Sequence, residues 1–191
     1  MRNIIGFLLC SIFFWGCQQD YRPKPKGFLA LNYPEAEYVS LSRDCPYTFK
    51  INEDAVLKSV VGDPCRFNIE YNDLKGVIYI TYEKVEDNLE KLLSDAQNLP
   101  LKHTIKADEI FGDEYENELH NTYGMLYTVT GNAASQAQFY ITDSTDNFVT
   151  GSIYFQRTPN YDSIYPAAEY LKDDMKKMME TLQWKKTPEI N

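Results

Sequence analysis

Ser135 and the two histidines are the residues of this sequence that could supply a nucleophile and its base. Ser135 ends the string Gly131-Asn132-Ala133-Ala134-Ser135, and His103 and His120 are the two imidazoles of the chain. A hydrolase would require the fold to place one imidazole against the Ser135 hydroxyl. The alternative is a turn in which Gly131 takes a positive φ and the polar side chains bond to the backbone. We favour the turn and expect both histidines to be structural.

Other chemistry has weaker support. The sequence contains no Gly-x-Ser-x-Gly elbow, Walker loop, dinucleotide-binding glycine fingerprint or His-Glu-x-x-His zinc helix. Asp143-Ser144-Thr145-Asp146-Asn147 has the close oxygen spacing of a calcium site, but it lacks the Gly and final Glu of an EF-hand loop, and a hairpin turn explains it. Paired carboxylates could also serve a glycosidase, although charge runs are usually solvated. We expect no enzyme activity, no cofactor and no metal.

The N-terminal residues have the pattern of a lipoprotein secretion signal. A basic start at Arg2 precedes an apolar run over 4–15, and Gly16 lies directly before Cys17. The run is too short to span a bilayer, which takes about 20 residues, so a retained transmembrane helix is the weaker interpretation. A buried N-terminal helix is the other alternative. We expect residues 1–16 to be removed, Cys17 to be lipidated, and the Pro-rich segment 17–26 to be a tether from the membrane.

Cys45 and Cys65 are then the only unmodified cysteines of an exported chain, because Cys10 leaves with the signal. Two cysteines in an oxidising compartment predict one disulfide. It would close a loop of some 20 residues and stabilise the fold by about 3 kcal/mol in the chain-entropy model. Structural zinc is disfavoured because only His103 and His120 could complete its ligands.

The elements that must position these residues are short strands and two helices. Strands are expected where β-type runs are bounded by turn residues, at 28–33, 47–51, 67–71, 77–82, 123–130, 135–142 and 148–157. Turns are expected at 73–76, 131–134 and 143–147, with the last three strands in a meander. Residues 102–122 are acidic and are expected to form a strand edge and an exposed connection.

Apolar spacing predicts one helix that Asn88 caps and Pro100 ends, and a long C-terminal helix that Asp162 or Ser163 caps and that runs to Leu182. The fold class is therefore α+β, an antiparallel sheet covered by an internal amphipathic helix and a long C-terminal helix. We expect one globular domain over 27–184, with Trp184 packed near its end, and a tail over 185–191.

Composition narrows the class of partner. The chain has 191 residues, 19 Lys and Arg against 28 Asp and Glu, a net charge of -9, 15 Tyr and 10 Phe. This acidity disfavours nucleic-acid binding, which needs a basic face. The many aromatic side chains favour a sheet.

Several unusual strings occur together and in order along the chain, and as a set they resemble the GldD family of gliding-motility lipoproteins of Bacteroidota. They are KPKGFL at 24–29, LNYP at 31–34, DCP at 44–46, ITY at 80–82, DAQ at 95–97, HTIKADEI at 103–110, YGM at 123–125, GNAASQ at 131–136 and PNYDSI at 159–164. The resemblance covers the whole chain and implies a cell-envelope lipoprotein that is required for gliding, linked to type IX secretion and without established catalytic activity. Its partners would be other lipoproteins of that machinery. The element order also resembles, in outline, the α/β/α sandwich of photosystem-II PsbP and Mog1-like proteins, an analogy that concerns the fold alone.

Two functional hypotheses follow. The first is a scaffold that holds a partner through an aromatic and polar patch, for which the candidates are Tyr123, Asn132, Ser135, Gln136, Phe139, Asn160 and Tyr161. The second is a periplasmic ligand-binding module or cryptic hydrolase, which predicts a closed pocket that brings His103 or His120 against Ser135 or a carboxylate. Because Gln18 follows Cys17 and the next residues match an acidic surface-export tag poorly, we expect the anchor to lie in the outer membrane and to face the periplasm.

Overall fold

The computed structural model describes residues 33–102, 106–156 and 160–185. The predicted signal, Cys17, the tether over 17–26, His103 and all but the last residue of the strand predicted at 28–33 lie outside these described residues, and that last residue, Tyr33, is not in a strand. No helix among the described residues is long and apolar enough to cross a membrane.

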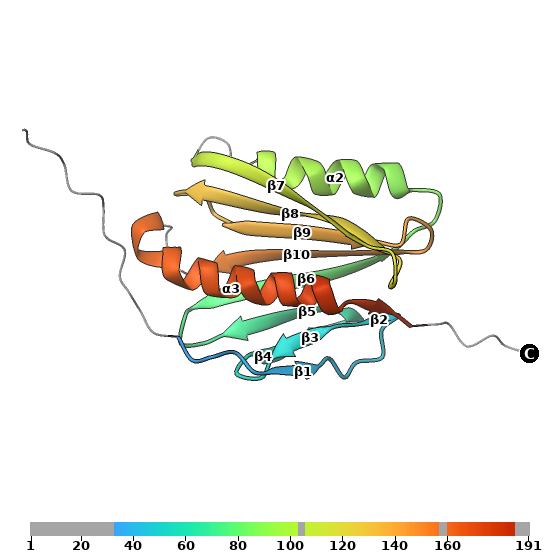
Figure 1. Ribbon diagram of the computed structural model, residues 1–191, viewed down its shortest axis with the longest axis horizontal. Coiled ribbons are helices and arrows are strands. Elements are labelled where there is room, and N and C mark those ends of the chain that lie inside the picture. The colour runs from blue at the N-terminus through green and yellow to red at the C-terminus, as the bar shows by residue number, and fades with distance from the viewer. Residues whose placement is uncertain (1–32, 103–105, 157–159, 186–191) are drawn as a thin grey trace, which may run out of the picture.

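A seven-stranded antiparallel sheet forms the centre of the fold (Figure 1), in the order β4-β5-β6-β10-β9-β8-β7. Its strands are β4 Val56–Val60, β5 Asp63–Tyr71, β6 Gly76–Lys84, β7 Ala107–Asn117, β8 Thr122–Gly131, β9 Ala137–Thr142 and β10 Asn147–Phe155. The predicted meander is confirmed, because β8 pairs with β9 and β9 pairs with β10. The acidic stretch after the first helix is a long edge strand, β7, with only 118–121 as the connection to β8.

Two small sheets flank the central one. β1, Tyr38–Ser40, pairs with β3, Lys50–Asn52. β2, Tyr47–Thr48, pairs with β11, Gln183–Trp184, so an early strand lies beside the last strand of the described chain. The prediction of one strand over 47–51 is wrong, and no strand was predicted at the position of β4. The run at 47–51 is divided because β2 and β3 pair with different partners, and β4 has an exposed, partly polar pattern that hid it.

Two helices cover opposite faces of the central sheet, as the predicted α+β class requires. α3, Tyr161–Thr181, packs on the face that holds Phe139 and Ile141, and its own residues Leu171, Met175 and Met178 are fully buried there. α2, Leu89–Leu101, lies on the other face, where Gln97 Nε2 donates to the hydroxyl of Tyr140 at 3.5 Å. Side chains alternate between the faces of a strand, so Tyr140 points away from Phe139 and Ile141.

Both predicted helix boundaries need correction. Pro100 does not end α2, which continues to Leu101. A proline in the last turn removes only one intrahelical donor, and the backbone N–H of Lys102 closes the end of the helix by donating to Leu99 O. α3 is not capped by Asp162 or Ser163. It begins at Tyr161 with Asn160 in the N-cap position, and the Asn160 side chain makes no capping hydrogen bond.

Candidate functional site

The structure does not bring Ser135 and His120 together. Ser135 follows the last residue of β8 and His120 lies before the first, so a ten-residue strand, about 30 Å long, separates them. Ser135 is fully buried and its hydroxyl donates to Ala137 O at 3.2 Å. The hydrolase alternative is therefore wrong for this pair, and the turn is confirmed: Gly131 has a φ of +88°.

The candidate patch divides into a buried part and an exposed part. Ser135, Gln136 and Phe139 are buried, so they support the surface and cannot touch a partner. Gln136 Nε2 donates to Ala133 O at 2.8 Å and thereby holds the loop after β8 closed. Tyr123 lies at the opposite end of β8 from this loop, beside α2, in a hollow that Leu93 and Tyr140 also line.

The exposed part joins the loop after β8 to the start of α3. Asn132 Oδ1 accepts a hydrogen bond from the backbone N–H of Tyr161 at 2.9 Å, so a side chain 29 residues away serves as the cap that α3 lacks locally. We call Asn132, Ala134, Asn160 and Tyr161 the junction surface. Three of these are exposed, and the Tyr161 ring is half-buried against Tyr165, with ring centroids 5.4 Å apart.

Acidic side chains make the electrostatic potential at Tyr161 of the junction surface negative. Burial, followed by the influence of Tyr165, Glu169 and Asp108, raises the pKa of Tyr161 to about 12. The phenol is therefore a neutral hydrogen-bonding group at physiological pH. An aromatic ring with polar neighbours is the composition that recurs at the centre of protein interfaces.

The 143–147 segment is a hairpin turn whose carboxylate is already occupied. Asp143 Oδ1 accepts from the backbone N–H groups of Thr145, Asp146 and Asn147 at 2.8–3.0 Å, and Oδ2 accepts from Asn147 Nδ2 at 2.6 Å. Burial acts to raise the pKa of Asp143, but these hydrogen bonds outweigh it, so the pKa lies below 3.8. Among the described residues, no cluster of His, Cys, Asp and Glu could hold a metal ion.

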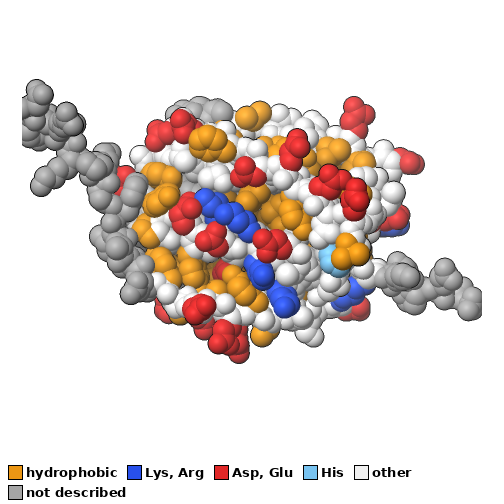
Figure 2. Space-filling model, viewed as in Figure 1, with side chains coloured by type: hydrophobic (Ala, Val, Ile, Leu, Met, Phe, Trp, Pro, Cys, Tyr) orange, Lys and Arg blue, Asp and Glu red, His pale blue; other side chains and the backbone are white. Residues whose placement is uncertain are grey.

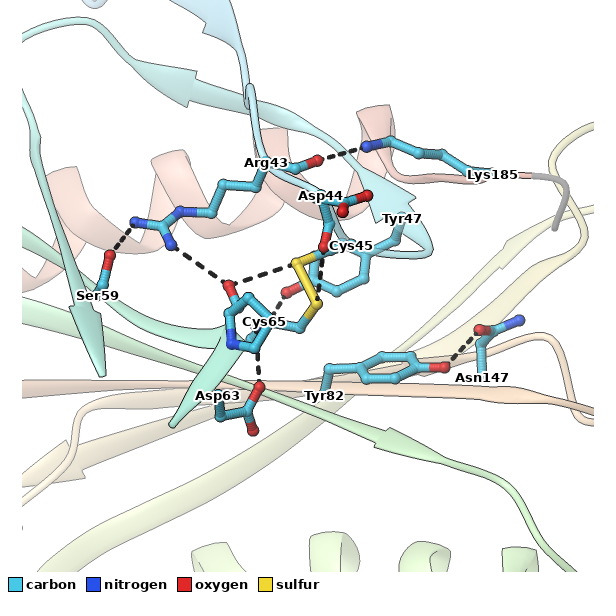
Figure 3. The surroundings of a disulfide bond; sticks show 11 residues. Arg43, Asp44, Cys45, Tyr47, Ser59, Asp63, Cys65, Tyr82, Asn147 and Lys185 are labelled. Atoms are coloured by element: carbon cyan, nitrogen blue, oxygen red, sulfur yellow. Dashed lines mark hydrogen bonds between the residues drawn. A yellow bond between two sulfur atoms is a disulfide. The ribbon is translucent and has the colours of Figure 1, made fainter. Parts of the chain in front are cut away.

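The predicted disulfide is confirmed (Figure 3). Cys45 and Cys65 are bonded, with their Cα atoms 5.4 Å apart, and they tie the segment before β2 to the start of β5. Arg43 reinforces this corner: its guanidinium donates to Ser59 Oγ at 3.0 Å and lies 4.7 Å from the centre of the Phe67 ring. The corner fixes the N-terminal segment on the sheet and contains no group arranged for catalysis.

A buried carboxylate that the sequence reading missed lies on the inner face of α3. Asp174 is 1% exposed and accepts hydrogen bonds from Tyr38 at 2.6 Å, Tyr71 at 2.7 Å and Asn52 at 2.9 Å. Asn52 Nδ2 also donates to the Tyr170 hydroxyl at 2.9 Å. Its position in the sequence could have revealed it, because Asp174 is the one charged residue among the buried, otherwise apolar residues of α3.

Comparison with known proteins identifies the family. The family model for gliding motility lipoprotein GldD matches residues 18–184, which include every described helix and strand. A search of curated proteins finds no match. Membership in this family makes the protein a membrane-anchored lipoprotein of the cell envelope with a role in gliding motility. Because this match covers most of the sequence, the chain belongs to the gliding motility lipoprotein GldD family.

Proposed function

We propose that the protein is a non-catalytic scaffold that holds or stabilises other lipoproteins of the gliding machinery and of type IX secretion. The observation that supports this is the hydrogen bond from Tyr161 N–H to Asn132, which fastens two distant segments into one exposed surface. A rigid aromatic side chain between polar ones can bind a partner at little entropic cost. Ser135 is buried in the loop after β8, where its hydroxyl donates to Ala137 O.

The anchor would place this surface in the periplasm. We propose that Cys17 is acylated, that the anchor lies in the outer membrane, and that 17–26 lets the folded part reach its partner. A Cys17→Ala variant should lose its partitioning into the detergent phase. An unchanged membrane fraction, or removal of the protein by protease added to intact cells, would contradict this part of the proposal.

The test of the scaffold places a charge on the junction surface without disturbing the fold. Ala134→Lys and Asn160→Lys alter exposed side chains, and Val61→Lys adds the same charge at a fully exposed position between β4 and β5. We expect the two junction variants to weaken partner capture about tenfold or more and to abolish colony spreading and type IX cargo release. The Val61→Lys control should behave as wild type, and unchanged urea unfolding should show that all three are folded.

The opposite pattern would indicate chemistry. Ser135→Ala, His103→Ala and His120→Ala should leave spreading and secretion largely intact. If a folded Ser135→Ala or His103→Ala protein were inactive while the junction variants spread normally, the scaffold proposal would be overturned.

A further inference from the structure

A pocket bounded by tyrosines lies where β5 ends and β6 begins, beside the middle of α3. Its volume is about 420 Å³, within the range of small-ligand sites. It is lined by Tyr33, Pro34, Asp54, Tyr71, Asn72, Asp73, Leu74 and Tyr170. Figure 2 shows hydrophobic side chains gathered at this end of the face, with acidic side chains around them. Tyr170 lies nine residues, about 14 Å, along α3 from Tyr161, so the pocket is distinct from the junction surface.

Three aromatic rings form the walls of the pocket. Tyr33 stacks on Tyr170 with ring centroids 4.9 Å apart, and Tyr71 meets Tyr170 edge-on at 6.5 Å. The face of an aromatic ring carries a negative electrostatic potential that attracts ammonium groups. Because Tyr33 and Tyr170 cover one face of each other, only the ring surface outside this stack can contact a ligand in the pocket.

Carboxylates make the same volume more negative. Asp54 and Asp73 line the pocket, and Asp174 lies beneath it, bonded to the Tyr71 hydroxyl. In the described part of the chain, no Lys or Arg forms an ion pair with any of these three aspartates. The negative charge therefore has no described counter-ion.

Burial and the nearby carboxylates raise the pKa values of two tyrosine hydroxyls of the pocket. Burial first, and then the charge of Asp174, raises the pKa of Tyr71 well above its ordinary value of 10. Burial and the charges of Asp174 and Asp54 also raise the pKa of Tyr170, although the hydrogen bond from Asn52 acts to lower it. Both phenols are neutral at physiological pH, so they add ring surface and oxygen acceptors without adding a charge that would need compensation.

We propose that the pocket of Tyr33, Tyr71 and Tyr170, with Asp54 and Asp73, binds an alkylammonium group such as the side chain of a lysine. The aromatic rings contact the alkyl stem and the ammonium group of the ligand, and the aspartates provide the opposite charge. A lysine side chain for this pocket could come from two sources. One is this chain itself, since Lys24 and Lys26 precede Tyr33 in the sequence by nine and seven residues. The other is a lysine of a separate molecule.

The binding experiment uses the lipidated protein in a nonionic detergent, with N-acetyl-lysine methylamide as probe in isothermal titration calorimetry. N-acetyl-norleucine methylamide, which has a similar apolar stem without the ammonium group, is the control ligand. The lysine probe should bind and the norleucine probe should not. Equal binding of both probes would overturn the proposal, because it would show an apolar site without charge recognition.

Two pairs of variants test the walls and the charge. Tyr33→Leu should weaken binding about fivefold, whereas Tyr33→Phe should stay within about twofold, because the ring remains and the buried Tyr33 hydroxyl has no hydrogen-bond partner among the described residues. Asp73→Asn should weaken binding about fivefold, and Tyr79→Leu, an exposed ring on the other face of the sheet, should not weaken it. Urea unfolding of each variant confirms that it is folded. Equal binding by Tyr33→Leu and Tyr33→Phe would refute the aromatic cage.

A Lys24→Gln/Lys26→Gln variant distinguishes the two sources. If the chain's own lysines fill the pocket, removing them should make the added probe bind more tightly. If the ligand comes from another molecule, the double variant should bind as wild type does. Absence of probe binding in both proteins would overturn the proposal. Ala134→Lys should bind the probe normally, so failure of the pocket and failure of the scaffold can be told apart.

Discussion

Replacing Asp174 should remove a large part of the stability of this fold. The carboxylate is buried and accepts three hydrogen bonds, two of them from the buried groups Tyr71 and Asn52. In Asp174→Ala these two donors lose their acceptor, while the Tyr38 hydroxyl, which is partly exposed, can turn to water. An orphaned buried donor costs about 1–3 kcal/mol, so we expect a total loss of about 3–4 kcal/mol.

Asparagine and a neighbouring aspartate provide the comparison. Asp174→Asn keeps one acceptor oxygen but turns an N–H₂ group toward a donor, so its loss should be about half as large. Asp173→Ala removes an exposed carboxylate that pairs with Lys176 at 3.2 Å, and it should change stability by less than about 0.5 kcal/mol. Urea unfolding measures all three, and for Asp174→Ala a midpoint about 1.5 M lower corresponds to the expected loss.

Alkaline pH gives a second measurement on the same network. Burial first, and then the hydrogen bond and charge of Asp174, raises the pKa of Tyr38, and Asp174 also raises that of Tyr71. The unfolded chain ionises its tyrosines near pH 10 and the folded chain does so only at higher pH, so the free energy of unfolding is unaffected below pH 10 and falls above it. The fall is about 1.4 kcal/mol per pH unit for each such tyrosine. In Asp174→Asn these tyrosines should ionise at lower pH, so the fall should level off at lower pH and be smaller in total. Stability within about 1 kcal/mol of wild type for Asp174→Ala, together with an unchanged tyrosine titration, would refute this account of the network.

Other predictions concern the disulfide, the 143–147 turn and one close contact in the core. Cys45→Ala/Cys65→Ala should lower the free energy of unfolding by about 3 kcal/mol, and labelling of both thiols in the native exported protein would disprove the bond. Asp143→Ala should cost about 1–3 kcal/mol at pH 7. Because the folded-state pKa of Asp143 is lowered, its contribution is fully present above pH 4 and is lost as pH falls, so a difference from wild type that stays constant down to pH 2 would contradict the hydrogen bonding described. Gly151→Ala should destabilise the fold by about 1–3 kcal/mol, because an added Cβ would overlap the ring of Phe139; wild-type thermal unfolding of this variant would show that the ring can move aside.

The sequence by itself determined the elements whose signals are local. The apolar spacing of Leu171, Met175 and Met178 identified the inner face of α3, and all three are buried. Turn residues marked the hairpins on both sides of β9. The cysteine count predicted the disulfide, because the predicted signal and the predicted lipid site leave only two thiols to pair, and Cys45 and Cys65 are bonded.

Tertiary structure decided what depends on residues far apart in the chain. The cap of α3 comes from Asn132, 29 residues earlier, so a search for a local cap chose Asp162 or Ser163 and was wrong. The short early strands were misplaced because β2 pairs with β11 at the far end of the chain, a contact that no local pattern encodes.

The candidate patch shows the same limit. Alternation along β9 showed that Phe139 belongs to a strand, but only the packing of α3 decided which face is interior and therefore that Phe139 is core. The tyrosine pocket joins residues from before β1, from the end of β5 and from α3. Each tyrosine looks like an ordinary aromatic residue in its own segment, and only the fold places the buried Asp174 carboxylate against the hydroxyl of Tyr71.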